Sequence, residues 1–150
     1  MTKNILIIEA VKHVDIAEKL YNAAKLELDK ADVSYEKISV PSCFEICQTL
    51  KMALDTDMYD GYITLGCIVK DESFEAKYMI AETIKSINFL ATSYGLPISY
   101  GIISAQNLEQ ALVEANNKGS LAAQTALKML TIYEYFIEKY EDFEPGLVEV

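Results

Sequence analysis

Short apolar runs alternate with segments of helical periodicity along most of the chain, and this alternation restricts the fold more than any other feature. Runs rich in isoleucine or valine are typical of strands buried on both faces. We predict four such strands, over residues 4–9, 34–40, 62–68 and 98–103. Strands that alternate with helices imply a parallel sheet with right-handed crossovers. The expected fold class is α/β: a three-layer α/β/α sandwich with a four-stranded parallel sheet in the flavodoxin-like order 2-1-3-4.

Between and after these strands, apolar residues recur at the spacing of amphipathic helices. The pattern predicts helices over residues 14–31, 44–54, 74–94, 107–116 and 120–140. Ser73 is the expected N-cap of the third helix, and Gly95 and Pro97 end it. Asn117, Lys118 and Gly119 indicate a turn between the last two helices.

Composition excludes several function classes. A net charge of -10 argues against nucleic-acid binding, since phosphate backbones require clustered positive charge. All 13 basic residues are lysine, so no bidentate guanidinium fork can form. His13 is the only histidine, which excludes the usual two-histidine zinc sites.

We expect a single cytoplasmic domain over residues 1–140, followed by an acidic tail over 141–150. No apolar run is long enough to span a membrane, and no signal peptide is visible. The three cysteines, Cys43, Cys47 and Cys67, are interpreted as buried apolar side chains in a reducing compartment rather than as metal ligands.

The functional crevice of a parallel α/β sheet lies beyond the carboxyl ends of its strands. This rule selects the four loops at residues 9–14, 41–45, 67–75 and 104–107. They contain no glycine-rich phosphate loop and no nucleophile elbow. They therefore predict a polar crevice without specifying a reaction.

Three polar features of these loops each have two interpretations. His13 is an acid–base candidate, or it is a solvated or helix-capping residue. Glu45 accepts hydrogen bonds from ligand hydroxyls, or it complements the dipole of the helix that begins there. The carboxylates of Asp71, Glu72 and Glu75 are crowded enough for one to keep and donate a proton, or they form a solvated helix start.

Several short motifs follow one another in a specific order between residues 4 and 129. They are Ile7-Ile-Glu-Ala10, Val40-Pro-Ser-Cys-Phe-Glu-Ile46, Leu65-Gly-Cys-Ile-Val-Lys70, Tyr94-Gly-Leu-Pro-Ile98 and Asn117-Lys-Gly119. Together they resemble the lumazine synthase family of riboflavin biosynthesis. The resemblance implies a transferase that condenses 5-amino-6-(ribitylamino)uracil with 3,4-dihydroxy-2-butanone 4-phosphate to give 6,7-dimethyl-8-ribityllumazine.

The resemblance also implies that no cofactor or metal takes part. It implies a homo-oligomer, a pentamer or a multiple of it, with sites between neighbouring subunits. The loop after the second strand would hold the ribityl chain, the end of the third strand the pyrimidine, and the following loop the phosphate. The implied substrate-binding residues are Lys12, His13, Cys43, Phe44, Glu45, Cys67, Ile68, Val69, Glu72, Ser73, Tyr100, Glu114 and Lys118.

This chain differs from the family pattern at pocket positions. Glu75 stands in place of the family's histidine, the proposed proton shuttle, and is therefore the candidate catalytic residue. Lys12 replaces an aromatic that stacks on the pyrimidine, and Val11 replaces the preceding arginine. Asp71 replaces a glycine, and Glu114 replaces the arginine that contacts the phosphate.

These differences leave three hypotheses. The first is an active lumazine synthase in which Lys12, Lys70 or Lys118 supplies the positive charge for phosphate. The second is a catalytically impaired paralogue that binds flavin or lumazine, or that serves as an assembly subunit. The third is a different small-molecule enzyme that uses the carboxylates of the third loop.

Overall fold

The computed structural model describes residues 2–142 and contains all four predicted strands. They are β1 (Lys3–Ala10), β2 (Val33–Val40), β3 (Gly61–Val69) and β4 (Ile98–Ala105). All neighbouring strands are parallel, and the sheet order is β2-β1-β3-β4, as predicted. Of the predicted acidic tail, residues 143–150 lie outside the described residues.

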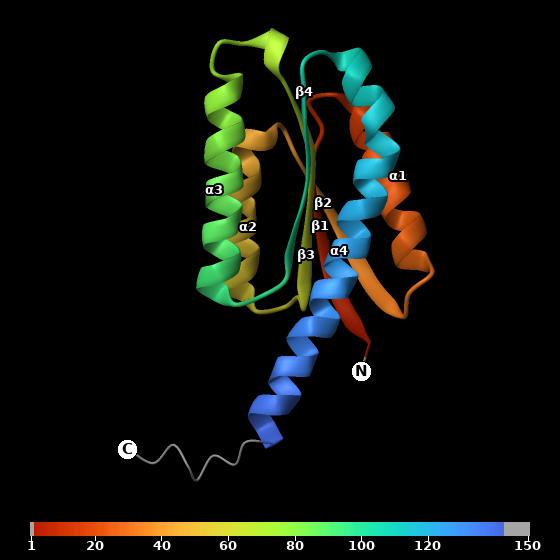
Figure 1. Cartoon of the computed structure of the whole chain (residues 1–150), viewed down its shortest axis with the longest axis vertical. Coiled ribbons are helices and arrows are strands. Elements are labelled where there is room, and N and C mark those ends of the chain that lie inside the picture. Colours follow the sequence, from red (N-terminus) through yellow and green to blue (C-terminus); the bar gives the residue numbers. More distant parts are fainter. Residues whose placement is uncertain (1, 143–150) are drawn as a thin grey trace.

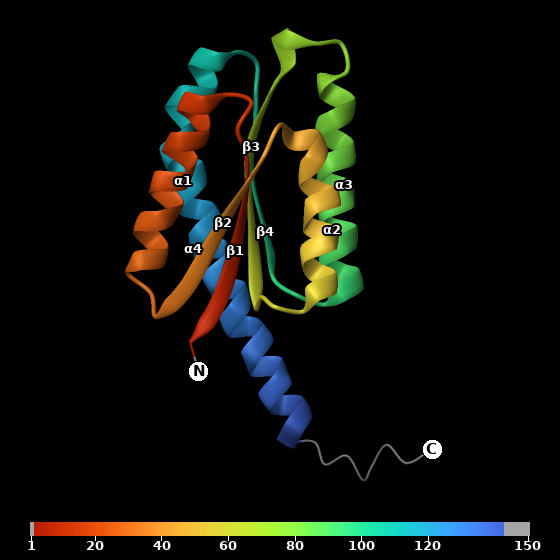
Figure 2. The same cartoon turned by 180° about the vertical axis from the view of Figure 1, so that it is seen from behind.

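Within the described residues, four helices cover the sheet, two on each face (Figures 1 and 2). Helices α1 (Val14–Asp29) and α4 (Leu108–Asp142) pack on one face, and α2 (Ile46–Thr56) and α3 (Ala76–Tyr94) pack on the other. Short 3-10 turns precede α2 and α3, at η1 (Cys43–Glu45) and η2 (Lys70–Glu72). The predicted three-layer α/β/α architecture is confirmed.

Strand β3 lies at the centre of both hydrophobic cores, and all nine of its residues are buried. Ile63 and Leu65 pack toward α1 and α4, whereas Tyr62 and Ile68 pack toward α2 and α3. Both faces of the strand therefore need apolar side chains, which explains its continuous apolar run. The loop that follows its carboxyl end lies beside the loops that follow β1 and β2.

The predicted turn at Asn117-Lys-Gly119 is wrong, because these residues lie inside the uninterrupted helix α4. Gly119 is buried, and a Cβ atom there would lie 2.3 Å from the backbone oxygen of Leu20 in α1. The glycine therefore permits the close contact of α1 and α4. Burial of this interface outweighs the low helix propensity of glycine, so the helix continues.

Replacing Gly119 with alanine should destabilise the protein by about 1–3 kcal/mol, because the added methyl group overpacks the contact with α1. Equilibrium urea unfolding at a fixed protein concentration measures the change. Asn117→Ala is the matched control: this residue is exposed in the same helix, and alanine there should keep or slightly raise stability. An unchanged midpoint for Gly119→Ala would contradict the proposed packing role.

Candidate functional site

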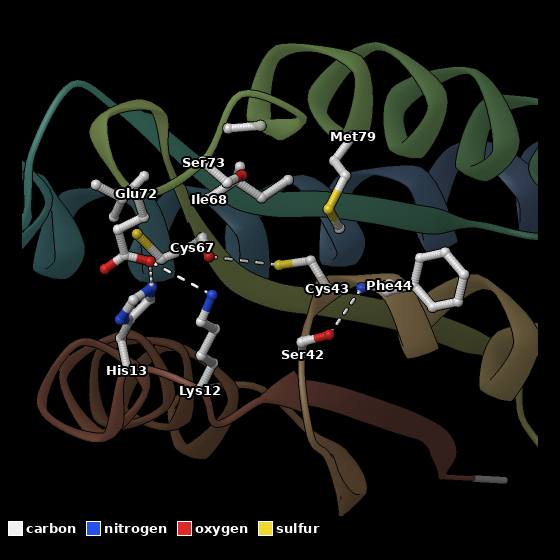
Figure 3. A pocket seen from close by; sticks show the side chains of 12 residues that line it. Lys12, His13, Ser42, Cys43, Phe44, Cys67, Ile68, Glu72, Ser73 and Met79 are labelled. Atoms are coloured by element: carbon white, nitrogen blue, oxygen red, sulfur yellow. Dashed lines mark hydrogen bonds and ion pairs between the residues drawn. The ribbon is translucent and has the colours of Figure 1, made fainter.

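A cavity of about 250 Å³ opens at the carboxyl ends of β1 and β3, beside the loop that follows β2 (Figure 3). It is lined by Lys12, His13, Ser42, Cys43, Phe44, Cys67, Ile68, Val69, Glu72, Ser73, Ala76 and Met79. Three of the four loops selected from the sequence contribute residues to the lining of this cavity. The fourth, after β4, supports the site from outside: the Gln106 amide donates to Oδ1 of Asp71 at 2.5 Å.

The loop after β2 is shaped by local capping. Ser42 is the N-cap of η1, where its Oγ accepts from the Phe44 backbone N–H at 3.3 Å. The same hydroxyl donates to Oε1 of Glu45 at 2.8 Å. Glu45 is half-buried at the N-cap position of α2, where its side chain makes no capping hydrogen bond. Ser42 thus orients a carboxylate beside the cavity.

Close packing of η1 on β3 forms the floor of the cavity. A Cβ atom on Gly66 would lie 2.6 Å from Sγ of Cys43, so only glycine permits this approach without displacement. The Cys43 thiol in turn lies 3.7 Å from the backbone oxygen of Cys67. The glycine inside this buried strand therefore fixes the distance between two walls of the cavity.

Two basic side chains of the first loop converge on one carboxylate oxygen. Oε2 of Glu72 lies 3.3 Å from Nε2 of His13 and 3.4 Å from Nζ of Lys12 (Figure 3). His13 occupies the N-cap position of α1, yet its side chain makes no capping hydrogen bond and is only 12% exposed. The interpretation of His13 as a solvated or capping side chain is therefore wrong.

The three carboxylates of the third loop have different surroundings. Glu72 faces the first loop, whereas Asp71 accepts from Gln106. Glu75 is exposed at the start of α3, on a neighbouring hollow of about 260 Å³ that shares Cys43, Phe44 and Met79 with the cavity. These different partners do not support the expectation of a single crowded cluster.

The predicted N-cap role of Ser73 is also wrong. Helix α3 begins at Ala76, with Glu75 at the N-cap position and no side-chain capping bond. Ser73 lies in extended backbone, where its carbonyl accepts from the Ala76 N–H at 3.3 Å. The two residues between them form a turn, so the helix starts two residues later than the apolar spacing predicts.

Four of the implied substrate-binding residues do not line the cavity: Glu45, Tyr100, Glu114 and Lys118. Glu114 is exposed on α4. Nζ of Lys118 lies 5.4 Å from the ring centre of Tyr100 at the sheet edge. The Tyr100 hydroxyl is buried without a partner in the described structure, and burial raises its pKa to about 12.

Three lining residues were not predicted: Ser42, Ala76 and Met79. Ser42 carried a detectable signal, because a serine three residues before a glutamate is typical of a helix start. Ala76 and Met79 lie three residues apart and so share one face of α3. Which face turns toward the cavity depends on how α3 packs.

The cavity thiols are poor nucleophiles. Burial, together with the negative charges of Glu72 and Glu114, raises the pKa of Cys67 to about 11. Burial also raises the pKa of Cys43 to about 12. Both thiols are therefore neutral at pH 7, and the wall that they form is apolar. No group of three His, Cys, Asp or Glu side chains within residues 2–142 is placed to hold a metal ion.

A polar-rimmed crevice at the strand ends of a parallel sheet defines an α/β protein of the small-molecule-binding class. Comparison with known proteins narrows this class. A profile of 6,7-dimethyl-8-ribityllumazine synthase matches residues 2–134. The chain therefore belongs to the 6,7-dimethyl-8-ribityllumazine synthase family, as the motif order predicted.

Individual relatives agree with this assignment. The 6,7-dimethyl-8-ribityllumazine synthase of Afipia carboxidovorans is 35% identical over 137 residues, which cover 85% of this chain and 84% of the relative. That of Agrobacterium fabrum is 34% identical over 138 residues, which cover 86% of this chain and 93% of the relative.

A solved structure supports the fold alone. A Peptoclostridium difficile 630 fragment described as a lipoprotein matches with a TM-score of 0.50 and 17% identity, covering 85% of this chain and 99% of the fragment.

None of the helices between residues 2 and 142 is both long enough and apolar enough to cross a membrane.

Alkylation should distinguish the two buried thiols, Cys43 and Cys67, from the half-buried thiol of Cys47. At pH 8, folded protein treated with iodoacetamide should keep Cys43 and Cys67 unmodified, because both pKa values lie well above this pH and both thiols are buried. Mass spectrometry of the digested protein measures the modification at each cysteine. Cys47, which is only half-buried, should react sooner, and all three should react in urea. Rapid labelling of Cys67 in the folded protein would contradict this assignment.

Proposed function

We propose that the protein is an active lumazine synthase. It condenses 5-amino-6-(ribitylamino)uracil with 3,4-dihydroxy-2-butanone 4-phosphate, and releases phosphate and water as 6,7-dimethyl-8-ribityllumazine forms. One observation carries the proposal: nine of the thirteen substrate-binding residues implied by the family resemblance line a single cavity at the strand ends. Several of these residues differ in type from the family pattern, but the cavity lies at the strand ends, where we place both substrates.

The proposed arrangement follows the three loops. Glu45, whose Oε1 accepts the Ser42 hydroxyl, presents its other oxygen to the hydroxyls of the ribityl chain, beside Cys43 and Phe44. The pyrimidine lies along the end of β3, against Ile68 and Val69. The phosphate-bearing substrate lies toward η2 and the first loop.

The chemistry requires little of the protein beyond orientation and proton transfer. The substrate's own amine is the nucleophile, so neutral thiols in the wall do not hinder the reaction. Holding two reactants in place supplies roughly 7–11 kcal/mol of such a barrier. Proton transfer by a positioned side chain typically adds ~10²–10⁴-fold.

Glu75 is the proposed acid–base residue. It begins α3 at the hollow next to the cavity, where exposure lets it exchange protons with water. A carboxylate can transfer protons between substrate atoms as an imidazole does, with a different pH optimum. The replacement of the family's histidine therefore changes the acid–base group without removing it.

We propose that the site is completed by neighbouring copies in a homopentamer or a multiple of it. Helices α2 and α3 expose large apolar side chains, among them Met52, Tyr78, Ile84 and Phe89. Scattered apolar residues are ordinary on a surface, but this number on two adjacent helices fits a subunit interface. The three free thiols support a cytoplasmic location.

Purified protein incubated with both substrates should form lumazine faster than the uncatalysed condensation, followed by absorbance. A rate equal to that background would overturn the proposed activity. Fluorescence titration with riboflavin and the lumazine would then test the binding-paralogue alternative.

Glu75→Gln should lower kcat about 10- to 100-fold, because the amide cannot transfer the proton. Glu18→Gln, on the exposed face of α1, is the charge-matched control and should leave kcat unchanged.

Light scattering coupled to gel filtration should give a particle of five chains, or a multiple of five. The physical reason is the apolar surface of α2 and α3, which isolated chains would leave in water. Met52→Glu combined with Phe89→Glu should shift the particle toward smaller species. A stable monomer of the unmodified chain at micromolar concentration would contradict the proposed assembly.

A further inference from the structure

Three side chains that line the cavity, those of Lys12, His13 and Glu72, form one cluster. Both basic nitrogens contact the same atom, Oε2 of Glu72, at 3.4 Å and 3.3 Å (Figure 3). The His13 side chain is 12% exposed, and that of Glu72 is 32% exposed. This cluster joins the first loop to the third across the cavity wall.

The cluster places an anionic oxygen between two nitrogen donors. A carboxylate oxygen and a phosphate oxygen are interchangeable ligands for such donors, because both accept short charge-assisted hydrogen bonds. The position held by Oε2 is therefore one that a phosphate oxygen can also occupy. Lys12 and His13 are the basic side chains that line the cavity, and Glu72 is the acidic one.

Glu72 is built so that it can leave this position. It belongs to the short turn η2, whose neighbouring backbone is held independently of it: the Asp71 N–H donates to the Gln106 carbonyl at 3.1 Å. Its side chain reaches solvent, so an alternative rotamer in water costs little. Lys12 is 60% exposed and follows a bound anion easily, whereas His13 is fixed by its burial.

We propose that Lys12 and His13 form the phosphate-binding pair of this site, and that Glu72 is an internal counter-ion that a phosphate monoester displaces. The proposal rests on the proposed function and deepens it by naming the cation of the phosphate subsite. Oε2 of Glu72 contacts both nitrogen donors and so occupies the position that the phosphate oxygen would take. It also returns to compete with the inorganic phosphate product and so favours its release.

The test is isothermal titration of the protein with inorganic phosphate at constant ionic strength. Lys12→Gln and His13→Gln should each raise the Kd about tenfold, because each removes a charge-assisted hydrogen bond. Glu72→Gln should lower the Kd about fivefold, because it weakens the internal competitor. Lys19→Gln, which removes an equal charge from the exposed face of α1, should leave the Kd unchanged.

Glu72→Gln is the decisive variant, because a residue that merely supports the fold would weaken phosphate binding when changed. An unchanged or raised Kd for Glu72→Gln overturns the proposal. So does an unchanged Kd for Lys12→Gln, and so does a larger loss of affinity in Lys70→Gln or Lys118→Gln. Urea midpoints of all variants show whether each is folded, and His13→Asn provides a second variant if His13→Gln is not.

Failure of this inference and failure of the proposed function give different results. If the unmodified protein forms lumazine but phosphate affinity ignores Lys12, His13 and Glu72, this inference alone fails. If phosphate affinity changes as expected but no lumazine forms, the proposed activity alone fails. In an active enzyme, Lys12→Gln should also raise KM for the butanone phosphate and leave KM for the pyrimidine nearly unchanged.

Discussion

The structure depends on the burial of β3 between two parallel neighbours and beneath helices on both faces. A strand in this position must pair its backbone on both edges and bury apolar side chains on both faces, which leaves little freedom for the rest of the sheet. Pairing of β3 with β1 and β4 aligns the strand ends. The crevice exists because three loops leave the sheet at this aligned edge.

Two close packing contacts, each made at a glycine, set the distances on either side of the sheet. Gly66 lets η1 lie against β3, and this contact fixes the loop that carries Cys43 and Phe44. Gly119 lets α4 lie against α1, whose first turn follows Lys12 and His13. In both cases the missing side chain matters because a methyl group would push apart two elements that hold parts of the site.

Because the chain contains no arginine, the basic side chains of the site are lysine and histidine. The basic side chains that line the cavity, Lys12 and His13, come from the first loop, and both contact Oε2 of Glu72. Carboxylates occupy two positions at which the family resemblance implies basic residues, Glu75 and Glu114. A condensation whose nucleophile is the substrate itself tolerates such changes better than one that needs an activated side chain, because orientation supplies most of the rate.

The sequence by itself determined the strands, the layer architecture, the sheet order and the family, because these follow from periodicity and from the order of short motifs. It also located the loops of the crevice, through the rule for parallel sheets. Tertiary structure decided the partner of His13, the start of α3 and the continuity of α4 through Gly119. These features depend on contacts between residues far apart in the chain, such as Gly119 with Leu20 and His13 with Glu72, and local patterns do not encode such distances.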